Sequence, residues 1–274
     1  MGTDDGSVAA LVLVGCGKMG TALLRGWLAG GAAARFFVVE PAGAPPELAT
    51  TANIAWHETA EALPDGLVPD AVVFAIKPQV VDMALPGYRR WVRPQTLFLS
   101  IVAGKTISGI TRHLGAAALV RTMPNTPAAI GRGITVACAN PLVTPDQRRF
   151  CDRLLAAVGE SAWVEDERLL DAVTALSGSG PAYVFLLIEA LAQAGESEGL
   201  APDLALRLAR ATVAGSGELA RLSVASPAQL RKDVTSPGGT TQAALDVLMG
   251  KDGLAQLIGR AVKAAAARSR ELAS

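Results

Sequence analysis

Short apolar runs, separated by segments long enough for a helix, dominate the first part of the chain. Val8–Val14 ends in glycines and predicts a buried parallel strand. Further runs predict strands at Phe36–Val39, Asn53–Trp56, Val72–Ile76, Leu97–Val102, Leu119–Met123, Ile134–Cys138 and Ser161–Val164. Strands that alternate with helices form βα units, so we expect an α/β fold with a mostly parallel sheet.

Beyond residue 165 the apolar positions recur with the helical period. Helices are predicted at Leu169–Leu176, Pro181–Ala194, Pro202–Leu222, Thr241–Met249 and Leu254–Leu272. Several of them carry a proline in the first turn, where it is tolerated. We therefore expect an α/β domain at residues 1–164 and an all-α domain at residues 165–274.

Composition narrows the class of protein. The chain has 274 residues, with 25 basic and 25 acidic side chains, and this balance argues against a dedicated nucleic-acid surface. Three scattered cysteines, Cys16, Cys138 and Cys151, predict neither a disulfide framework nor a metal site. The start of the chain lacks a signal peptide's basic residues, and each apolar stretch is broken before the ~18 residues of a membrane span. We expect a cytoplasmic protein with no membrane partner.

A glycine motif, Gly15-Cys16-Gly17-Lys18-Met19-Gly20, lies between the first predicted strand and a predicted helix at Thr21–Ala29. In dinucleotide-binding folds the first glycine allows a tight turn, and the second lets a pyrophosphate approach the backbone. The third lets helix and strand pack closely. We expect the phosphates of a dinucleotide at the free amides of this helix start, with a plain glycine-rich turn as the alternative.

Glu40 ends the second predicted strand, twenty residues after Gly20. A carboxylate at this place accepts hydrogen bonds from the adenosine ribose and favours NAD. No Arg or Lys in residues 41–51 is present to bind a 2′-phosphate. On these residues alone NADH is slightly favoured, and an exposed strand-end glutamate is the alternative.

Small and polar residues end the later strands of the predicted sheet. Ligands bind at the carboxyl ends of parallel strands, so we expect the backbone of Ala75-Ile76-Lys77-Pro78 to line the cofactor. Ala103 and Gly104 leave room for a flat ring. Asn125 either shapes the nicotinamide pocket or simply turns the chain.

The segment Val234-Thr235-Ser236-Pro237-Gly238-Gly239-Thr240-Thr241 runs directly into a predicted helix. Its glycines permit unusual backbone angles, its hydroxyls stand beside converging amides, and the helix start adds partial positive charge. These features fit a neutral receptor for a carboxylate, and they equally fit an elaborate helix cap.

Strong general acids are scarce in the sequence. The two histidines, His57 and His113, are expected to be solvated rather than catalytic. A ketone reductase needs a proton donor for the alkoxide. A protonated imine is already activated for hydride attack and needs mainly orientation and electrostatics. The residues therefore favour an imine substrate.

These motifs together resemble the pyrroline-5-carboxylate reductase family over nearly the whole chain. The most specific segment is 230–248, and 15–20, 75–79, 100–107, 121–127 and 175–185 are also typical. The resemblance implies hydride transfer from NAD(P)H to the C=N bond of 1-pyrroline-5-carboxylate, giving L-proline in the last step of proline biosynthesis. It further implies a Rossmann-type first domain, a helical substrate-binding and dimerisation domain, and a homodimer or assembly of dimers that share active sites.

By position, the resemblance implies that the loop before the last helices holds the substrate carboxylate, with Thr241 as the catalytic residue near the imine nitrogen. The implied substrate-binding residues are Ser236, Gly238, Gly239, Thr240 and Thr241. The implied cofactor-binding residues are Gly15, Gly17, Lys18, Met19, Gly20, Glu40, Ala75, Ile76, Lys77, Pro78, Ala103, Gly104, Asn125 and Asp233. The cofactor implied is NADPH, with NADH as the alternative.

Two departures from the family pattern bear on cofactor choice. Asp233 stands where an amide is typical, and Thr59 falls about where an asparagine is typical. Two other functions stay open. One is a reductase of a different substrate, such as a six-membered cyclic imine, and the other is a non-catalytic NAD(P)-binding protein.

Overall fold

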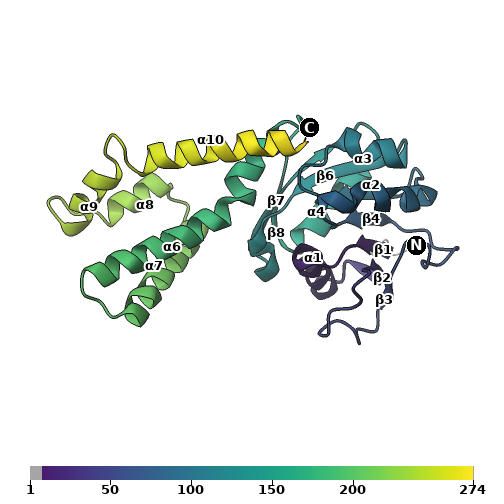
Figure 1. Cartoon of the computed structure of the whole chain (residues 1–274), viewed down its shortest axis with the longest axis horizontal. Coiled ribbons are helices and arrows are strands. Elements are labelled where there is room, and N and C mark those ends of the chain that lie inside the picture. Colours follow the sequence, from purple (N-terminus) through teal and green to yellow (C-terminus); the bar gives the residue numbers. More distant parts are fainter. Residues whose placement is uncertain (1–7, 274) are drawn as a thin grey trace. The chain divides into compact units, whose positions relative to one another are not determined.

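An eight-stranded sheet organises the first part of the protein (Figure 1). The computed structural model describes residues 8–273. The strands are β1 (Val8–Val14), β2 (Ala33–Val39), β3 (Ile54–His57), β4 (Ala71–Phe74), β5 (Leu97–Ser100), β6 (Ala118–Met123), β7 (Gly133–Ala139) and β8 (Gly159–Trp163). Neighbouring strands are parallel except β6 and β7. The predicted fold class is confirmed.

The strands lie in the order β3-β2-β1-β4-β5-β6-β7-β8, so the direction in which successive strands are added to the sheet changes at β1. The chain builds outward from β1 to β3, then returns to place β4 on the other side of β1. Such a reversal leaves a crevice at the carboxyl ends of the two central strands, where ligands bind in folds of this class. The glycine motif follows β1 and Ala75 follows β4, so both reach this crevice.

Helices cover both faces of the sheet, because successive side chains of a buried parallel strand point to opposite sides. On one face Trp27 of α1 (Lys18–Ala29) is fully buried, and its indole N–H donates to the Leu154 carbonyl of α4 (Pro145–Ala156) at 2.9 Å. On the other face Tyr88 and Trp91 are buried, and the Trp91 indole N–H donates to the Leu67 carbonyl at 2.9 Å.

The remaining helices follow the chain. They are η1 (Pro78–Val80), α2 (Val81–Ala84), η2 (Leu85–Trp91), α3 (Ile107–Leu114), η3 (Thr126–Ile130), α5 (Leu169–Val173), η4 (Thr174–Gly178), α6 (Gly180–Ser197), α7 (Pro202–Leu222), α8 (Pro227–Asp233), α9 (Thr240–Leu248) and α10 (Leu254–Ala273). The short helices after β4 interrupt the helical period, which is why apolar spacing did not predict them.

Two compact units divide the chain at Gly178–Ser179. One unit contains the chain up to Gly178 together with the residues from Ala266 onward, and the other contains Ser179–Ala265. The expected boundary near residue 165 falls inside the first unit. The reason is that Leu170 of α5 is fully buried among Met123 and neighbouring side chains of the sheet. Ser269 of α10 also donates to Asp171 Oδ1 at 2.6 Å.

The helical run Leu169–Ser197 corrects one expectation. Each apolar stretch was expected to end before the length of a membrane span, but a π-helical turn, η4, continues the helical run from α5 into α6. The run is long and apolar enough to cross a membrane by length and composition alone, with a mean hydropathy of 1.4, and only 11% of that window is buried. Length and composition are weak evidence for a membrane helix. The low buried fraction shows that most of this helical run is exposed in the single chain.

The second unit is built on the pair α6 and α7, which lie side by side (Figure 1). The buried residues of this pair are small, namely Ala192, Ala205 and Ala209. Large apolar side chains of α6 are instead exposed, including Val184, Phe185, Leu186, Leu187 and Leu191. The unit therefore buries a modest core and presents an apolar helix surface.

Candidate active site

The turn after β1 requires glycine at two of its three glycine positions. Gly15 has a φ of +89°, and a Cβ there would lie 2.7 Å from the Ala75 carbonyl oxygen. A Cβ on Gly20 would lie 2.3 Å from the Gly15 carbonyl oxygen. These contacts fix the turn and the packing of α1 against β1 and β4, as the motif predicts.

Gly17 differs from the other two glycines because a Cβ built there meets nothing within 4 Å. Its backbone is extended, and it begins α1 without a side-chain cap. The first-turn amides of α1 therefore face an open cradle, which a side chain at residue 17 would partly fill. A helix start of this kind binds phosphate through its amides and its positive end.

Glu40 is held against the glycine turn. Cys16 donates its backbone N–H to Glu40 Oε2 at 2.7 Å, and Ala42 donates its N–H to Glu40 Oε1 at 3.1 Å. The Glu40 backbone N–H donates to the His57 carbonyl, which joins the ends of β2 and β3. The carboxylate therefore lies half-buried beside the turn.

A cleft of about 560 Å³ opens at these strand ends. Six of the predicted cofactor residues line it, namely Gly15, Gly17, Glu40, Ala75, Ile76 and Lys77. The cleft also contains residues that the sequence did not single out, including Glu58, Glu61, Met83 and Tyr88. Its mixture of backbone, apolar and carboxylate groups suits one half of a dinucleotide.

A second cleft of about 360 Å³ shares four of its wall residues with the first. The shared residues are Gly17, Ala75, Ile76 and Lys77. Predicted residues Lys18, Met19, Pro78 and Ala103 complete this second cleft with Ile101, Met123 and Pro124. The two adjoining clefts give an extended ligand two compartments separated by the glycine turn and the end of β4.

Four predicted cofactor residues line neither cleft, namely Gly20, Gly104, Asn125 and Asp233. Gly104 has a φ of +71°, and a Cβ there would lie 2.9 Å from the Leu272 carbonyl oxygen, so its small size serves the approach of α10. Asn125 does not line either described cleft. Its Oδ1 accepts the Ile134 N–H at 2.9 Å, and this bond joins η3 to β7. In this structure Gly104 and Asn125 both have structural contacts, and their contact with a cofactor stays a prediction.

The predicted carboxylate receptor belongs to the second unit. Gly238 has a φ of +70°, and Gly239 donates its N–H to the Ser236 carbonyl at 3.0 Å, which closes a tight turn. Gly239 then begins α9, so Thr240 and Thr241 supply first-turn amides and hydroxyls. The loop thus consists of a tight turn followed by a helix start, and its role as a carboxylate receptor stays a prediction.

Asp233 precedes that loop at the end of α8. Its Oδ1 accepts the side-chain N–H of Gln229 at 2.7 Å, one helical turn earlier. The residue is exposed, and its predicted cofactor contact is untested.

Cys16, inside the glycine turn, is buried and unsuited to nucleophilic chemistry. Burial raises the pKa of its thiol, against a smaller opposite effect of a hydrogen bond with Thr21. A neutral thiol is a weak nucleophile.

The comparison with curated proteins decides the family. A pyrroline-5-carboxylate reductase of Pseudomonas aeruginosa is 38% identical over 271 residues, which cover 97% of this chain and 98% of that protein. The chain belongs to the pyrroline-5-carboxylate reductase family. The resemblance predicted from the motifs is thereby confirmed.

Solved structures agree with this assignment. A pyrroline-5-carboxylate reductase from Coxiella burnetii matches with a TM-score of 0.89 and 32% identity, covering 98% of this chain and 100% of that chain. A pyrroline carboxylate reductase from Plasmodium falciparum, solved with NADP bound, matches with a TM-score of 0.81 and 29% identity, covering 97% and 98%. The first relative of known structure therefore spans the whole architecture, and the second was solved with its dinucleotide.

Two family models divide the reductase into parts. A model described as NADP oxidoreductase, coenzyme F420-dependent, matches residues 10–104, which contain the glycine turn and Glu40. A model described as pyrroline-5-carboxylate reductase dimerisation matches residues 167–272, which contain the exposed helix α6 and the receptor loop.

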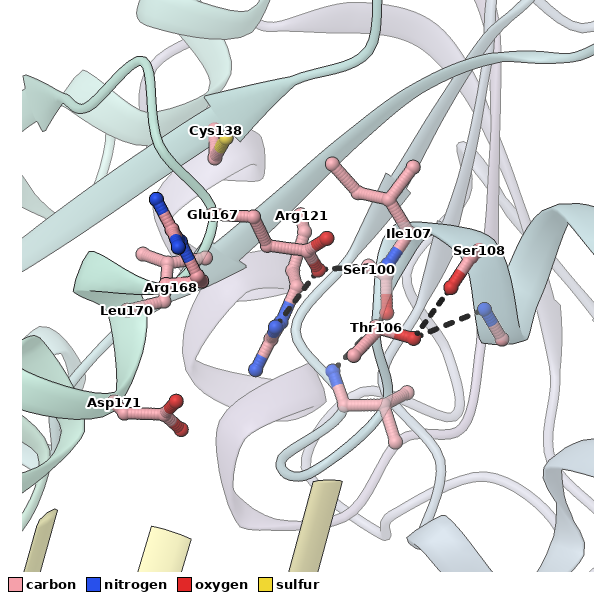
Figure 2. Close-up of polar contacts among 12 residues, drawn as sticks. Ser100, Thr106, Ile107, Ser108, Arg121, Cys138, Glu167, Arg168, Leu170 and Asp171 are labelled. Carbon is pink, nitrogen blue, oxygen red and sulfur yellow. Dashed lines mark hydrogen bonds and ion pairs between the residues drawn. The ribbon is translucent and has the colours of Figure 1, made fainter. Parts of the chain in front are cut away.

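A buried ion pair of this reductase escaped the sequence analysis (Figure 2). Arg121 of β6 donates from Nη1 to Glu167 Oε1 at 2.8 Å, and Ile107 donates its backbone N–H to the same oxygen at 2.7 Å. Only 4% of the Arg121 side chain is exposed, and its buried Nε has no partner among the described residues. The pair ties the start of α3 to the segment before α5.

The strand that carries Arg121 and its neighbour β5 both lead to residues that line the second cleft. Ser100 pairs with Arg121 across β5 and β6, and the cleft is lined by Ala103, which follows β5, and by Met123, which ends β6. The sequence analysis did not single out Glu167, because it stands in an acidic stretch that looks solvent-exposed.

Proposed function

We propose that this protein reduces the ring C=N bond of 1-pyrroline-5-carboxylate to L-proline, using a reduced nicotinamide dinucleotide. The observation that carries the proposal is full-length similarity to pyrroline-5-carboxylate reductases, combined with a dinucleotide cleft built around the glycine turn. NADPH is supported by the relative solved with NADP and by the NADP oxidoreductase model, and NADH is supported by Glu40.

In this proposal residues 1–164 bind the dinucleotide. The amides from Gly15 to Gly20 hold the pyrophosphate, because α1 begins there with an open cradle. Lys77 contributes positive charge between the two clefts whose walls it shares. A bound reduced nicotinamide supplies the hydride that the reaction needs.

Residues 165–274 bind the substrate and form the dimer in this proposal. The substrate carboxylate is held by hydroxyl and amide groups of the receptor loop, Ser236, Gly238, Gly239, Thr240 and Thr241. Thr241 is the catalytic residue in this scheme, because its hydroxyl approaches the imine nitrogen and orients the ring. A protonated imine needs no strong acid from the protein, which fits the shortage of histidines.

The partner is a second copy of this chain. The apolar surface of α6 lies within the match to the dimerisation model, and Phe185 and Leu186 are more than half exposed, at 58% and 63%. Exposed apolar side chains packed along one helix are typical of a subunit interface. We propose that each active site combines the dinucleotide cleft of one subunit with the receptor loop of its partner, in a cytoplasmic homodimer or an assembly of dimers.

The first experiment measures oxidation of NADPH and NADH with and without pyrroline-5-carboxylate, with proline quantified as the product. We expect oxidation only when the substrate is present, and one proline for each dinucleotide oxidised. Dinucleotide binding without substrate-dependent oxidation would reject the proposed reaction.

A second experiment tests Thr241. Thr241→Ala should lower turnover at least tenfold while dinucleotide affinity stays near that of the natural protein, because the loss affects only the imine end of the site. Thr241→Ser keeps the hydroxyl and is the matched control, expected to recover most of the turnover. Equal turnover of the Ala variant and the natural protein would remove Thr241 from the mechanism.

A further inference from the structure

The end of α10 packs against the segment between β5 and α3, which comprises residues 101–106 and is here called the β5–α3 loop. Gly104 of this loop has a left-handed φ of +71°, and a Cβ there would lie 2.9 Å from the Leu272 carbonyl oxygen. Only glycine combines this backbone angle with so close an approach. The last turn of α10 therefore rests directly on the backbone of the loop.

A buried hydrogen bond holds the same end of α10 from a second side. The Ser269 side chain is buried, and its hydroxyl donates to Asp171 Oδ1 of α5 at 2.6 Å, across 98 positions of sequence. Ser269 and Leu272 are three residues apart, so both contacts fall within one turn of the helix. The final residues of α10, the β5–α3 loop and α5 all belong to the first compact unit.

Two cations lie near the carbonyl end of α10. Lys105 and Arg112 line a cavity of about 260 Å³ together with Leu272. Positive side chains stabilise a helix C-terminus, where the last carbonyl groups lack partners within the helix. Both cations also pair with Asp82, at 3.8 Å and 2.9 Å. This cavity therefore belongs to the contact between α10 and the loop, and the cations support that contact.

The opposite side of the β5–α3 loop forms part of the second cleft. Ile101 and Ala103 line that cleft, whereas Gly104 contacts α10. The loop holds itself weakly, because its hydrogen bond from the Lys105 N–H to the Val102 carbonyl is long, at 3.5 Å. Its conformation therefore depends on support from outside. A wall that is ordered before binding lowers the entropy lost when a ligand enters the cleft.

We propose that the end of α10 positions the wall of the second cleft, and that Ser269 and Asp171 are positioning residues for the nicotinamide half of the cofactor. The inference rests on the proposed function, because it assumes that the second cleft receives this half. Neither residue lines a described cleft, so both act through Gly104 and Ala103. Loss of their hydrogen bond loosens the helix end, and the loop then holds the nicotinamide ring less well.

Two ligands that differ only in the nicotinamide group test this proposal without turnover. The dissociation constants of NADPH and of 2′-phospho-ADP-ribose are measured by calorimetry for the natural protein and for Ser269→Ala. We expect the variant to bind NADPH about fivefold more weakly, the factor that one hydrogen bond typically contributes. The affinity for 2′-phospho-ADP-ribose should stay unchanged, because this ligand lacks the group that the loop positions.

Asp171 supplies the matched pair of variants. Asp171→Asn keeps an oxygen that accepts from Ser269, so it should keep the NADPH affinity of the natural protein. Asp171→Ala should behave as Ser269→Ala does. The double variant should bind NADPH no more weakly than either single variant, because both substitutions remove the same bond.

Gly104→Ala tests the contact between the loop and α10. Gly115→Ala is its control, because Gly115 also has a positive φ, of +87°, but a Cβ there meets nothing within 4 Å. Both substitutions strain the backbone, and only the first displaces the Leu272 carbonyl. We expect Gly104→Ala to weaken NADPH binding, with little further loss when it is combined with Ser269→Ala, and Gly115→Ala to leave it unchanged.

Unchanged NADPH affinity in Ser269→Ala would overturn the inference, because the cleft would then not depend on the helix end. Equal loss of affinity for both ligands would also overturn it, since the damage would then extend beyond the nicotinamide half. Either result leaves the proposed function intact if the natural protein reduces pyrroline-5-carboxylate. The expected pattern of affinities, together with no turnover of that substrate, would support the inference and reject only the proposed reaction.

Discussion

The glycine turn allows one substitution to separate ligand binding from folding. Gly17 and Gly20 both belong to the motif, but they have opposite surroundings. A Cβ on Gly17 meets open space, whereas a Cβ on Gly20 would lie 2.3 Å from a backbone oxygen. Gly17→Ala should therefore damage dinucleotide binding and leave folding intact, and Gly20→Ala should damage folding.

The magnitudes follow from these contacts. At Gly17 the loss of a good helix cap and the reduced entropy of the unfolded chain oppose each other, so the free energy of unfolding should change by less than about 1 kcal/mol. At Gly20 the clash is between backbone atoms that have little freedom to move. Overpacking of this kind costs about 3 kcal/mol, and a unit of this size loses about 2–4 °C in unfolding temperature per kcal/mol, so the decrease should be roughly 6–12 °C.

The assay combines thermal unfolding with titration of NADH and NADPH. For Gly17→Ala we expect an unfolding temperature within a few degrees of the natural protein and dissociation constants raised at least tenfold, because the methyl group occupies the place where a pyrophosphate approaches the backbone. Normal dinucleotide affinity in Gly17→Ala would show that the phosphates bind elsewhere. An unchanged unfolding temperature in Gly20→Ala would show that the turn relaxes more easily than its contacts indicate.

Further predictions concern the buried polar groups. Glu167→Gln should leave Arg121 buried without its counter-ion and lower the stability by about 3 kcal/mol, whereas Asp166→Asn, in an exposed pair, should unfold as the natural protein does; equal loss in both would contradict the role of the buried pair. The three buried thiols should react with a thiol reagent only on unfolding, because burial raises their pKa; fast reaction of the native protein would refute this. Burial also raises the pKa of Tyr88, so the folded state holds more protons than the unfolded chain at high pH. Stability should therefore be intact at neutral pH and fall above about pH 9 in thermal unfolding scans, and a constant unfolding temperature up to pH 10 would contradict it.

Much of the sheet follows from apolar runs. Val8–Val14 and Leu119–Met123 were predicted to within a residue, because buried parallel strands are apolar throughout. The antiparallel pairing of β6 with β7 was not predicted, since apolar runs contain no information on strand direction. The helical run through Gly178 was not predicted either, because glycine normally marks the end of a helix and apolar spacing does not indicate a π-helical turn.

The residues of the candidate site also fall into a predicted group and an unpredicted group. Residues that act through the backbone, such as Gly15 and Ala75, were predicted because a glycine motif at a strand end is a local signal. Glu58 and Glu167 were not predicted, because their roles depend on which strand ends and loops meet in space. Glu58 joins Glu40 only because β3 pairs with β2, and Glu167 joins Arg121 across 46 positions of sequence.

Helical spacing predicts the helices of the second unit but does not indicate that the apolar surface of α6 is exposed. A helix that is apolar around much of its circumference is normally buried, yet the apolar run through α6 is only 11% buried. Fully burying a side chain such as Phe185 or Leu186 contributes about 1.5–3 kcal/mol. Burial of the exposed apolar residues of α6 against a partner would therefore add stability that the single chain lacks. A second copy with the same surface recovers it through a symmetric interface. We therefore expect a dimer at micromolar concentration by light scattering, and Phe185→Glu should lower both its stability and its turnover, whereas Glu160→Gln, an exposed change in β8, should alter neither. A stable monomer with full activity would refute both the interface and the shared active site.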